Sequence, residues 1–132
     1  MPVDIEFSSN KRYIVYTITD PIEMTELFEA YATEKAYRDS VPHTVHSIVD
    51  MSRIRRIPPN WLTAKAGPGL THPRSGYMIF VGLSTGFKML LQMIMRLMQY
   101  NKTEFVETRE QANALLNDVL KAEDLANENS PG

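Results

Sequence analysis

The chain has 132 residues, of which 43% are hydrophobic and 23% are charged, a balance typical of one globular domain. It contains no cysteine, which excludes disulfide bonds and thiolate metal sites. The N-terminal segment lacks the basic and apolar pattern of a signal peptide, and no apolar run reaches the roughly 18 residues of a membrane-spanning helix. We therefore expect a cytoplasmic protein without a transmembrane segment.

The net charge of −2 conceals an uneven distribution. Residues 1–50 hold nine acidic residues and four Lys or Arg, and residues 104–132 hold seven acidic residues and two Lys or Arg. Residues 51–103, in contrast, hold no acidic residue and eight Lys or Arg. Two interpretations stay open. Flanking helices could neutralise the basic segment, or the segment could attract an anion, an acidic protein or anionic lipid.

The first third of the chain predicts a hairpin followed by a helix. Val3–Phe7 and Arg12–Thr19 are the two strands of the hairpin. Asp20 as N-cap, with Pro21 and a capping-box Glu23, then predicts a helix start. Its expected apolar stripe consists of Met24, Leu27, Phe28 and Tyr31.

The middle third predicts two buried strands, Thr44–Met51 and Tyr77–Gly82. Between them, prolines predict a short helix over residues 58–66 that ends at Gly67. After the second strand, Ser84 or Thr85 can cap a helix that runs from Phe87 to about Gln99.

The last third predicts a short strand at Phe105-Val106 and a capping box from Thr108 to Gln111 that starts an amphipathic helix. We expect residues 1–121 to form the domain and residues 122–132 to form a polar, frayed tail. The order β-β-α-β-α-β-α-β-α predicts an α/β fold with a mostly parallel sheet covered by helices and right-handed crossovers.

This order resembles the STAS domain, and more closely the bacterial SpoIIAA-like group. The likeness covers about residues 3–121. The residues that carry it are Ile48-Val49-Asp50-Met51-Ser52, then Ile54, Ile57 and Leu62, then Val81-Gly82 before a capped helix, and Phe105 ahead of Thr108. The resemblance implies a regulatory, protein-binding domain.

One departure from that family concerns phosphorylation. In the anti-sigma antagonists an Asp-Ser-Ser-Gly-like stretch begins the next helix, and its second serine accepts phosphate. Here the matching stretch is Pro58-Pro59-Asn60-Trp61, and asparagine has no hydroxyl group. The resemblance therefore implies the scaffold and its binding role without the phosphorylation switch.

Motifs for catalysis are missing from the sequence. It contains no nucleophile elbow, phosphate-binding glycine loop or dinucleotide fingerprint. His43 and His46 are three residues apart on a strand and point to opposite faces, which disfavours a shared metal. We expect no catalytic residue, no cofactor and no metal, and an enzyme of unknown type is the weakest alternative.

Polar residues follow the two predicted central strands, where open α/β sheets bind ligands. Arginine side chains and a helix N-terminus both favour anions there. This predicts an anion-binding or partner-binding rim, with solvated arginines as the alternative. The rim consists of Asp50, Ser52, Arg53, Arg55, Arg56, Asn60, Ser84 and Thr85.

The helix from Phe87 has a wide apolar arc of roughly 240° around a narrow polar stripe. The stripe consists of Lys88, Gln92, Arg96 and Gln99, and the residues opposite it, expected to face the sheet, are Phe87, Leu90, Ile94 and Leu97. The remaining side chains are covered by neighbouring helices or form an exposed patch for a partner or ligand. They are Met89, Leu91, Met93, Met95, Met98 and Tyr100.

These patterns favour a non-enzymatic regulatory or protein-interaction domain that self-associates, as a homodimer, or docks a protein partner through the Met-rich helix of residues 87–100. The alternative is a carrier or sensor of a small amphipathic ligand such as a fatty acid, with its head group on the arginines and its tail on the methionines. Nucleic-acid binding is disfavoured, because the net charge is acidic.

Overall fold

A computed structural model describes residues 3–55 and 72–128 of the chain. In these residues a five-stranded sheet and three helices form an α/β fold, which confirms the predicted class and the mostly parallel sheet. The elements are β1 (Val3–Phe7), β2 (Tyr13–Thr19), α1 (Met24–Ser40), β3 (Val45–Arg53), β4 (Ser75–Val81), α3 (Thr85–Leu97), β5 (Thr103–Val106) and α4 (Arg109–Glu128).

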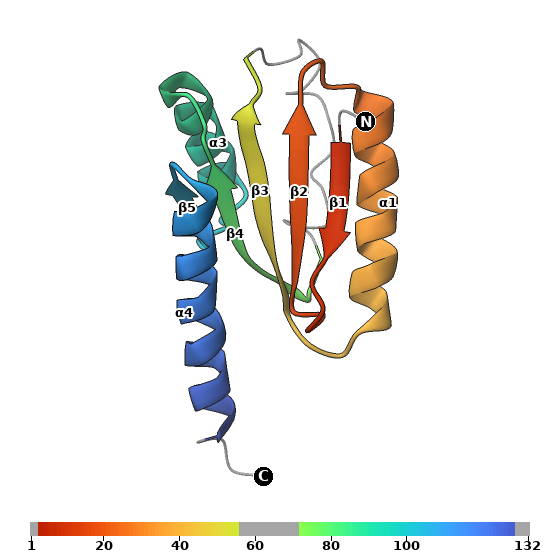
Figure 1. Cartoon of the computed structure of the whole chain (residues 1–132), viewed down its shortest axis with the longest axis vertical. Helices are drawn as coiled ribbons and strands as arrows, with labels where there is room; N and C mark the ends of the chain where they lie inside the picture. Colours follow the sequence, from red (N-terminus) through yellow and green to blue (C-terminus); the bar gives the residue numbers. More distant parts are fainter. Residues whose placement is uncertain (1–2, 56–71, 129–132) are drawn as a thin grey trace.

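The strands follow one another across the sheet in the order β1-β2-β3-β4-β5 (Figure 1). The pair β1 and β2 is antiparallel, as a hairpin requires, and the other three pairs are parallel. Val15 of β2 lies opposite Ile48 of β3, which lies opposite Ile79 of β4. The apolar centre of the sheet is therefore formed by three neighbouring parallel strands.

Helices cover both faces of the sheet. On one face, α1 and α3 contribute Leu27, Phe87 and Leu91 to a core that includes Val49 of β3 and Phe80 of β4. On the other face, α4 packs its apolar side against the alternate strand residues (Figure 1). That second core contains Val15, Ile48, Ile79, Val81, Ala112, Leu116 and Leu120.

The start of α1 differs from the prediction. The helix begins at Met24 with Glu23 as N-cap, and no side chain caps it. The Asp20 carboxylate instead accepts a hydrogen bond from the Arg55 backbone N–H at 2.6 Å. Because a long-range contact takes the acceptor, the expected local cap does not form.

The buried side of α1 also differs from the predicted apolar stripe. Leu27 is buried, but Phe28 is exposed, and Met24 and Tyr31 are half-buried. The helix instead buries two charged residues farther along, Glu34 and Arg38. Because these two residues pair with each other, the core can accept them, and the apolar pattern alone could not indicate this.

The C-terminal part of the chain is more ordered than predicted. The helix α4 continues through Glu128, where a frayed tail was expected from Ala122. Contacts of Glu123 and Asp124 with Arg12 explain the extension, because they hold the last turns against the sheet. The helix expected over residues 58–66, with its end at Gly67, lies outside the described residues.

Two predicted helix starts are confirmed. The Ser84 hydroxyl accepts a hydrogen bond from the Phe87 N–H at 3.3 Å, so Ser84 is the N-cap of α3. At α4, the Gln111 N–H donates to the Thr108 hydroxyl, and the Gln111 side chain accepts from the Thr108 N–H, both at 3.2 Å. These contacts form the predicted capping box.

Among the described helices, none has the length and apolar character needed to cross a membrane.

Candidate functional site

The outer face of α3 exposes large apolar side chains. Met89, Met93 and Leu97 are 64%, 51% and 77% exposed and recur every four residues, and Met98 at the end of the helix is 39% exposed. We call Met89, Met93 and Leu97 the α3 apolar face, and Met98, nine residues after Met89, lies on another side of the helix. A contiguous apolar patch on a surface is typical of a binding surface, whereas single exposed apolar residues are normal.

The structure corrects the predicted composition of this patch. Leu91 and Met95 lie in the core, and Tyr100 is half-buried with its hydroxyl donating to the Gly76 carbonyl. Leu97, expected to face the sheet, is the most exposed member of the α3 apolar face. The buried residues Phe87, Leu91 and Met95 recur every four residues, so the buried stripe is rotated from the expected one.

Basic residues lie along one side of the α3 apolar face. The Lys88 ammonium group lies 5.5 Å from the centre of the Phe105 ring, which places it toward the β5 edge of the sheet. Arg96, eight residues later, lies on nearly the same side of the helix and is exposed. Residues 72–103, which include α3, contain no acidic side chain.

The predicted rim is partly brought together at the carboxyl ends of β3 and β4. The Asp50 carboxylate accepts hydrogen bonds from the Ser52 hydroxyl at 2.7 Å and its N–H at 3.0 Å, and lies 3.5 Å from the Arg109 guanidinium. Burial alone would raise the pKa of Asp50, but the Ser52 hydrogen bonds and Arg109 outweigh burial and lower it. The negative charge of Asp50 is therefore already balanced by Arg109 of the same chain.

The other rim residues have varied positions. Arg53 ends β3, Arg55 follows it, and both are exposed, as is Thr85 at the start of α3. Ser84 is also exposed, although its hydroxyl caps α3. Arg56 and Asn60 lie outside the described residues. A head group on these arginines with an acyl tail on the methionines stays a prediction.

A buried ionic network lies between α1 and the sheet. Arg38 and Glu34 are 0% and 2% exposed, and the Arg38 Nε donates to the Glu34 carboxylate at 2.7 Å. The same carboxylate accepts from the Tyr16 hydroxyl at 2.6 Å, and Arg38 also donates to the Ser47 hydroxyl at 2.7 Å and to the Val45 carbonyl. Burial and then Glu34 raise the pKa of Tyr16 far above its ordinary value.

Sequence reasoning missed this network, although one signal was present. Glu34 and Arg38 are four residues apart on a helix, which allows an ion pair. Such pairs are usually exposed, and the spacing alone does not distinguish a buried pair from a surface pair. The buried polar partner Ser47 lies on β3 and could not be assigned without the fold.

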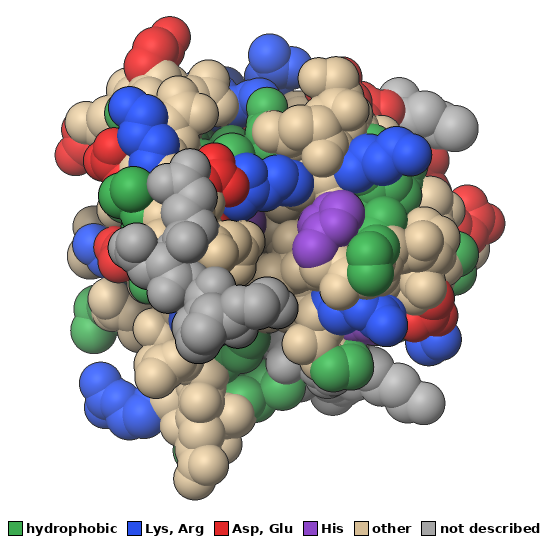
Figure 2. Space-filling model, turned by 90° about the horizontal axis from the view of Figure 1, so that it is seen from below, with side chains coloured by type: hydrophobic (Ala, Val, Ile, Leu, Met, Phe, Trp, Pro, Cys, Tyr) green, Lys and Arg blue, Asp and Glu red, His purple; other side chains and the backbone are tan. Residues whose placement is uncertain are grey.

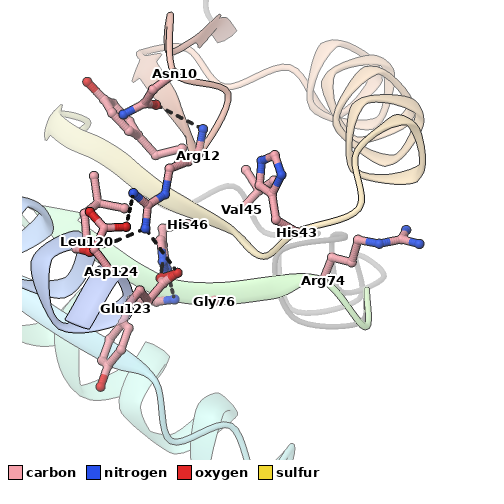
Figure 3. A network of polar contacts seen from close by, with 12 residues as sticks. Asn10, Arg12, His43, Val45, His46, Arg74, Gly76, Leu120, Glu123 and Asp124 are labelled. Atoms are coloured by element: carbon pink, nitrogen blue, oxygen red, sulfur yellow. Dashed lines mark hydrogen bonds and ion pairs between the residues drawn. The ribbon is translucent and has the colours of Figure 1, made fainter. Parts of the chain in front are cut away.

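A second polar network lies at the end of the sheet opposite the rim, where the strands β2, β3 and β4 begin. Figure 2 views the molecule from this edge and shows Lys, Arg and His side chains around the middle of the face. His46 of β3 and Arg12, just before β2, both contact Glu123 of α4, and Arg12 also pairs with Asp124 at 2.9 Å (Figure 3). This arrangement gives His46 a structural role between β3 and α4.

Both ring nitrogens of His46 are engaged in hydrogen bonds. Nδ1 accepts from the Tyr77 backbone N–H at 2.9 Å, which assigns the proton to Nε2, and Nε2 donates to the Glu123 carboxylate. This His–Glu pair has no free nitrogen to accept a proton from a substrate. Within residues 3–55 and 72–128, no three His, Asp or Glu side chains are grouped to hold a metal ion.

Comparisons of this chain with family models, with curated proteins and with solved structures find no match.

Proposed function

We propose that this chain is a non-enzymatic interaction domain that associates with a second copy of itself through the α3 apolar face. The observation that carries the proposal is the exposure of Met89, Met93 and Leu97 on one face of α3. Methionine side chains are flexible and adapt to a facing surface, which suits such a contact. A regulatory role of the STAS type belongs to the same proposal.

The spacing of the α3 apolar face supports pairing of two identical helices. Met89 and Leu97 each lie four residues from Met93, so the stripe is symmetric about its centre. In an antiparallel pair related by a two-fold axis, Met93 packs on the second copy's Met93, and Met89 packs on the second copy's Leu97. Rows of residues four apart are the ridges that most often interdigitate when helices pack.

Two features of the pair set its strength. The patch is small, and contacts that bury less than about 1,200 Å² are usually weak, so we expect micromolar rather than nanomolar dissociation constants. The two-fold axis also brings Lys88 and Arg96 of both copies to one side of the pair. Their repulsion is screened by salt, so association strengthens as the ionic strength rises.

The Met93→Glu substitution tests the proposal, because it places a charge at the centre of the pair. We expect light scattering on the concentrated wild-type chain to show a dimer and Met93→Glu to shift it to the monomer, with a dissociation constant at least tenfold higher. The matched control is Leu125→Glu, since Leu125 is a 59% exposed apolar side chain on α4. This control should leave the dimer intact.

If Met93→Glu did not weaken the dimer, the two copies would have to meet through another surface. A chain that stays monomeric at high protein concentration and high salt would contradict self-association itself. Association that instead weakens as salt is added would indicate an acidic surface facing the α3 apolar face, contrary to the symmetric pair.

A further inference from the structure

We propose that His46, Arg12, Glu123 and Asp124 form an acid-sensitive latch, which holds the C-terminal part of α4 on the sheet and releases it when His46 becomes protonated. These four residues come from three parts of the chain: the turn before β2, the start of β3 and the end of α4 (Figure 3). We call them the α4 latch.

The contacts of the α4 latch concentrate on one short stretch of helix. Arg12 pairs with Asp124 at 2.9 Å and with Glu123 at 3.5 Å, and it donates to the Leu120 carbonyl at 3.4 Å. His46 donates to the other oxygen of Glu123. All these acceptors lie beyond Val119, where Leu120 is the last α4 side chain of the core, whereas Ala112 and Leu116 hold the first half of the helix on the sheet. After Leu120, the end of α4 is therefore held by the polar contacts of Arg12 and His46.

The position of His46 leaves its ring little freedom to move. The side chain is buried, and its ring fills the space beside Gly76, where a Cβ atom would overlap both Nδ1 and Cε1. The Tyr77 ring lies on another side, with its centre 6.1 Å from that of His46. Because the ring cannot turn in this space, its hydrogen-bond partners are fixed.

Protonation conflicts with one of these partners. An imidazolium donates from both nitrogens, so a protonated Nδ1 would face the Tyr77 N–H, donor against donor. The proton would also place a charge in a buried position. Release of the helix end lowers the cost of the buried charge, because it lets water reach the ring.

The charged groups around His46 act in opposite directions. Burial lowers its pKa, the Glu123 carboxylate on α4 opposes this shift, and Arg12 and Lys102, which precede β2 and β5, add to it, with a net lowering. We expect release of the helix end to restore the ordinary pKa of histidine, about 6.5. The latch is therefore fully stable above that pH and loses stability as the pH falls below it.

Hydrogen exchange read by mass spectrometry tests the α4 latch, with each rate corrected for its intrinsic pH dependence. On acidification from about pH 7.5 to about pH 5.5, we expect protection of residues 119–127 to fall in the full wild-type chain, by at most about tenfold. Residues 109–116 of the same helix should change less. The fall should disappear in His46→Gln and persist in the matched control His43→Gln/His72→Gln, which lacks the other two histidines.

Protection that does not change with pH in the wild-type chain would overturn the proposal, as would a fall that persists in His46→Gln. If His46→Gln does not fold, the control variant supplies a second readout. Its one remaining histidine gives a single Hε1 resonance in NMR spectra, and we expect the titration midpoint of this resonance below the ordinary pKa of histidine. A midpoint at or above that value would overturn the proposal.

Discussion

Replacing Arg38 with methionine should lower the free energy of unfolding by about 3–5 kcal/mol, because the substitution leaves the buried Glu34 carboxylate without its counter-ion. It also removes the hydrogen bonds that Arg38 donates to Ser47 and to the Val45 carbonyl. Urea unfolding of the two proteins at neutral pH measures the difference.

Two further variants separate the cause from a general loss of packing. Glu34→Met/Arg38→Met removes both charges and should recover most of the lost stability, since an apolar pair of similar size avoids the cost of desolvating ions. Lys35→Ala removes the exposed Lys35–Asp39 pair of the same helix and should have little effect on stability, because exposed ion pairs contribute little. If Arg38→Met cost no more than Lys35→Ala, the description of a buried ionic network would be wrong.

Replacing Gly76 with alanine should cost about 2–3 kcal/mol, because the added Cβ overlaps the His46 ring and lies 2.8 Å from the Thr44 Cγ2. His46 would have to leave its position, with loss of its hydrogen bonds to Tyr77 and Glu123. Thermal or urea unfolding measures the loss of stability.

Gly86→Ala is the matched control for that substitution. A Cβ at Gly86 would have no atom within 4 Å, and Gly86 lies within α3. Alanine has a higher helix propensity than glycine, so we expect the free energy of unfolding to rise by up to about 0.5–1 kcal/mol. Equal effects of the two substitutions would contradict the close packing of His46 against Gly76.

Local sequence patterns predicted the elements of this fold well where local chemistry decides them. The hairpin strands, the Ser84 cap and the Thr108–Gln111 capping box depend on residues close together in the chain, and the structure has them near the predicted positions. The apolar strands Thr44–Met51 and Tyr77–Gly82 differ only at their ends from β3 and β4.

Long-range contacts account for most of the differences. Asp20 contacts Arg55 instead of capping α1, and Glu123 and Asp124 extend α4 because they meet Arg12, more than 100 residues earlier. Local periodicity in the sequence cannot indicate these pairings between distant segments. The polar network around His46 was missed for the same reason, since its parts lie in three separate segments.

The candidate surface was predicted in part. The apolar arc of the helix was correctly recognised as wider than one sheet requires, and Met89, Met93 and Met98 are exposed. The direction of the buried stripe was misjudged, because an almost wholly apolar helix offers several equivalent stripes and only the packing selects among them. Leu91 and Met95 are therefore core residues, and Leu97 takes their place on the surface.

Sedimentation velocity of the wild-type chain, over a wide range of protein and salt concentrations, tests most directly whether the apolar side of α3 joins two copies. We expect a reversible rise from monomer toward dimer that shifts to lower protein concentration as salt is raised from about 0.01 M to 1 M. A single monomeric species under all these conditions would contradict it.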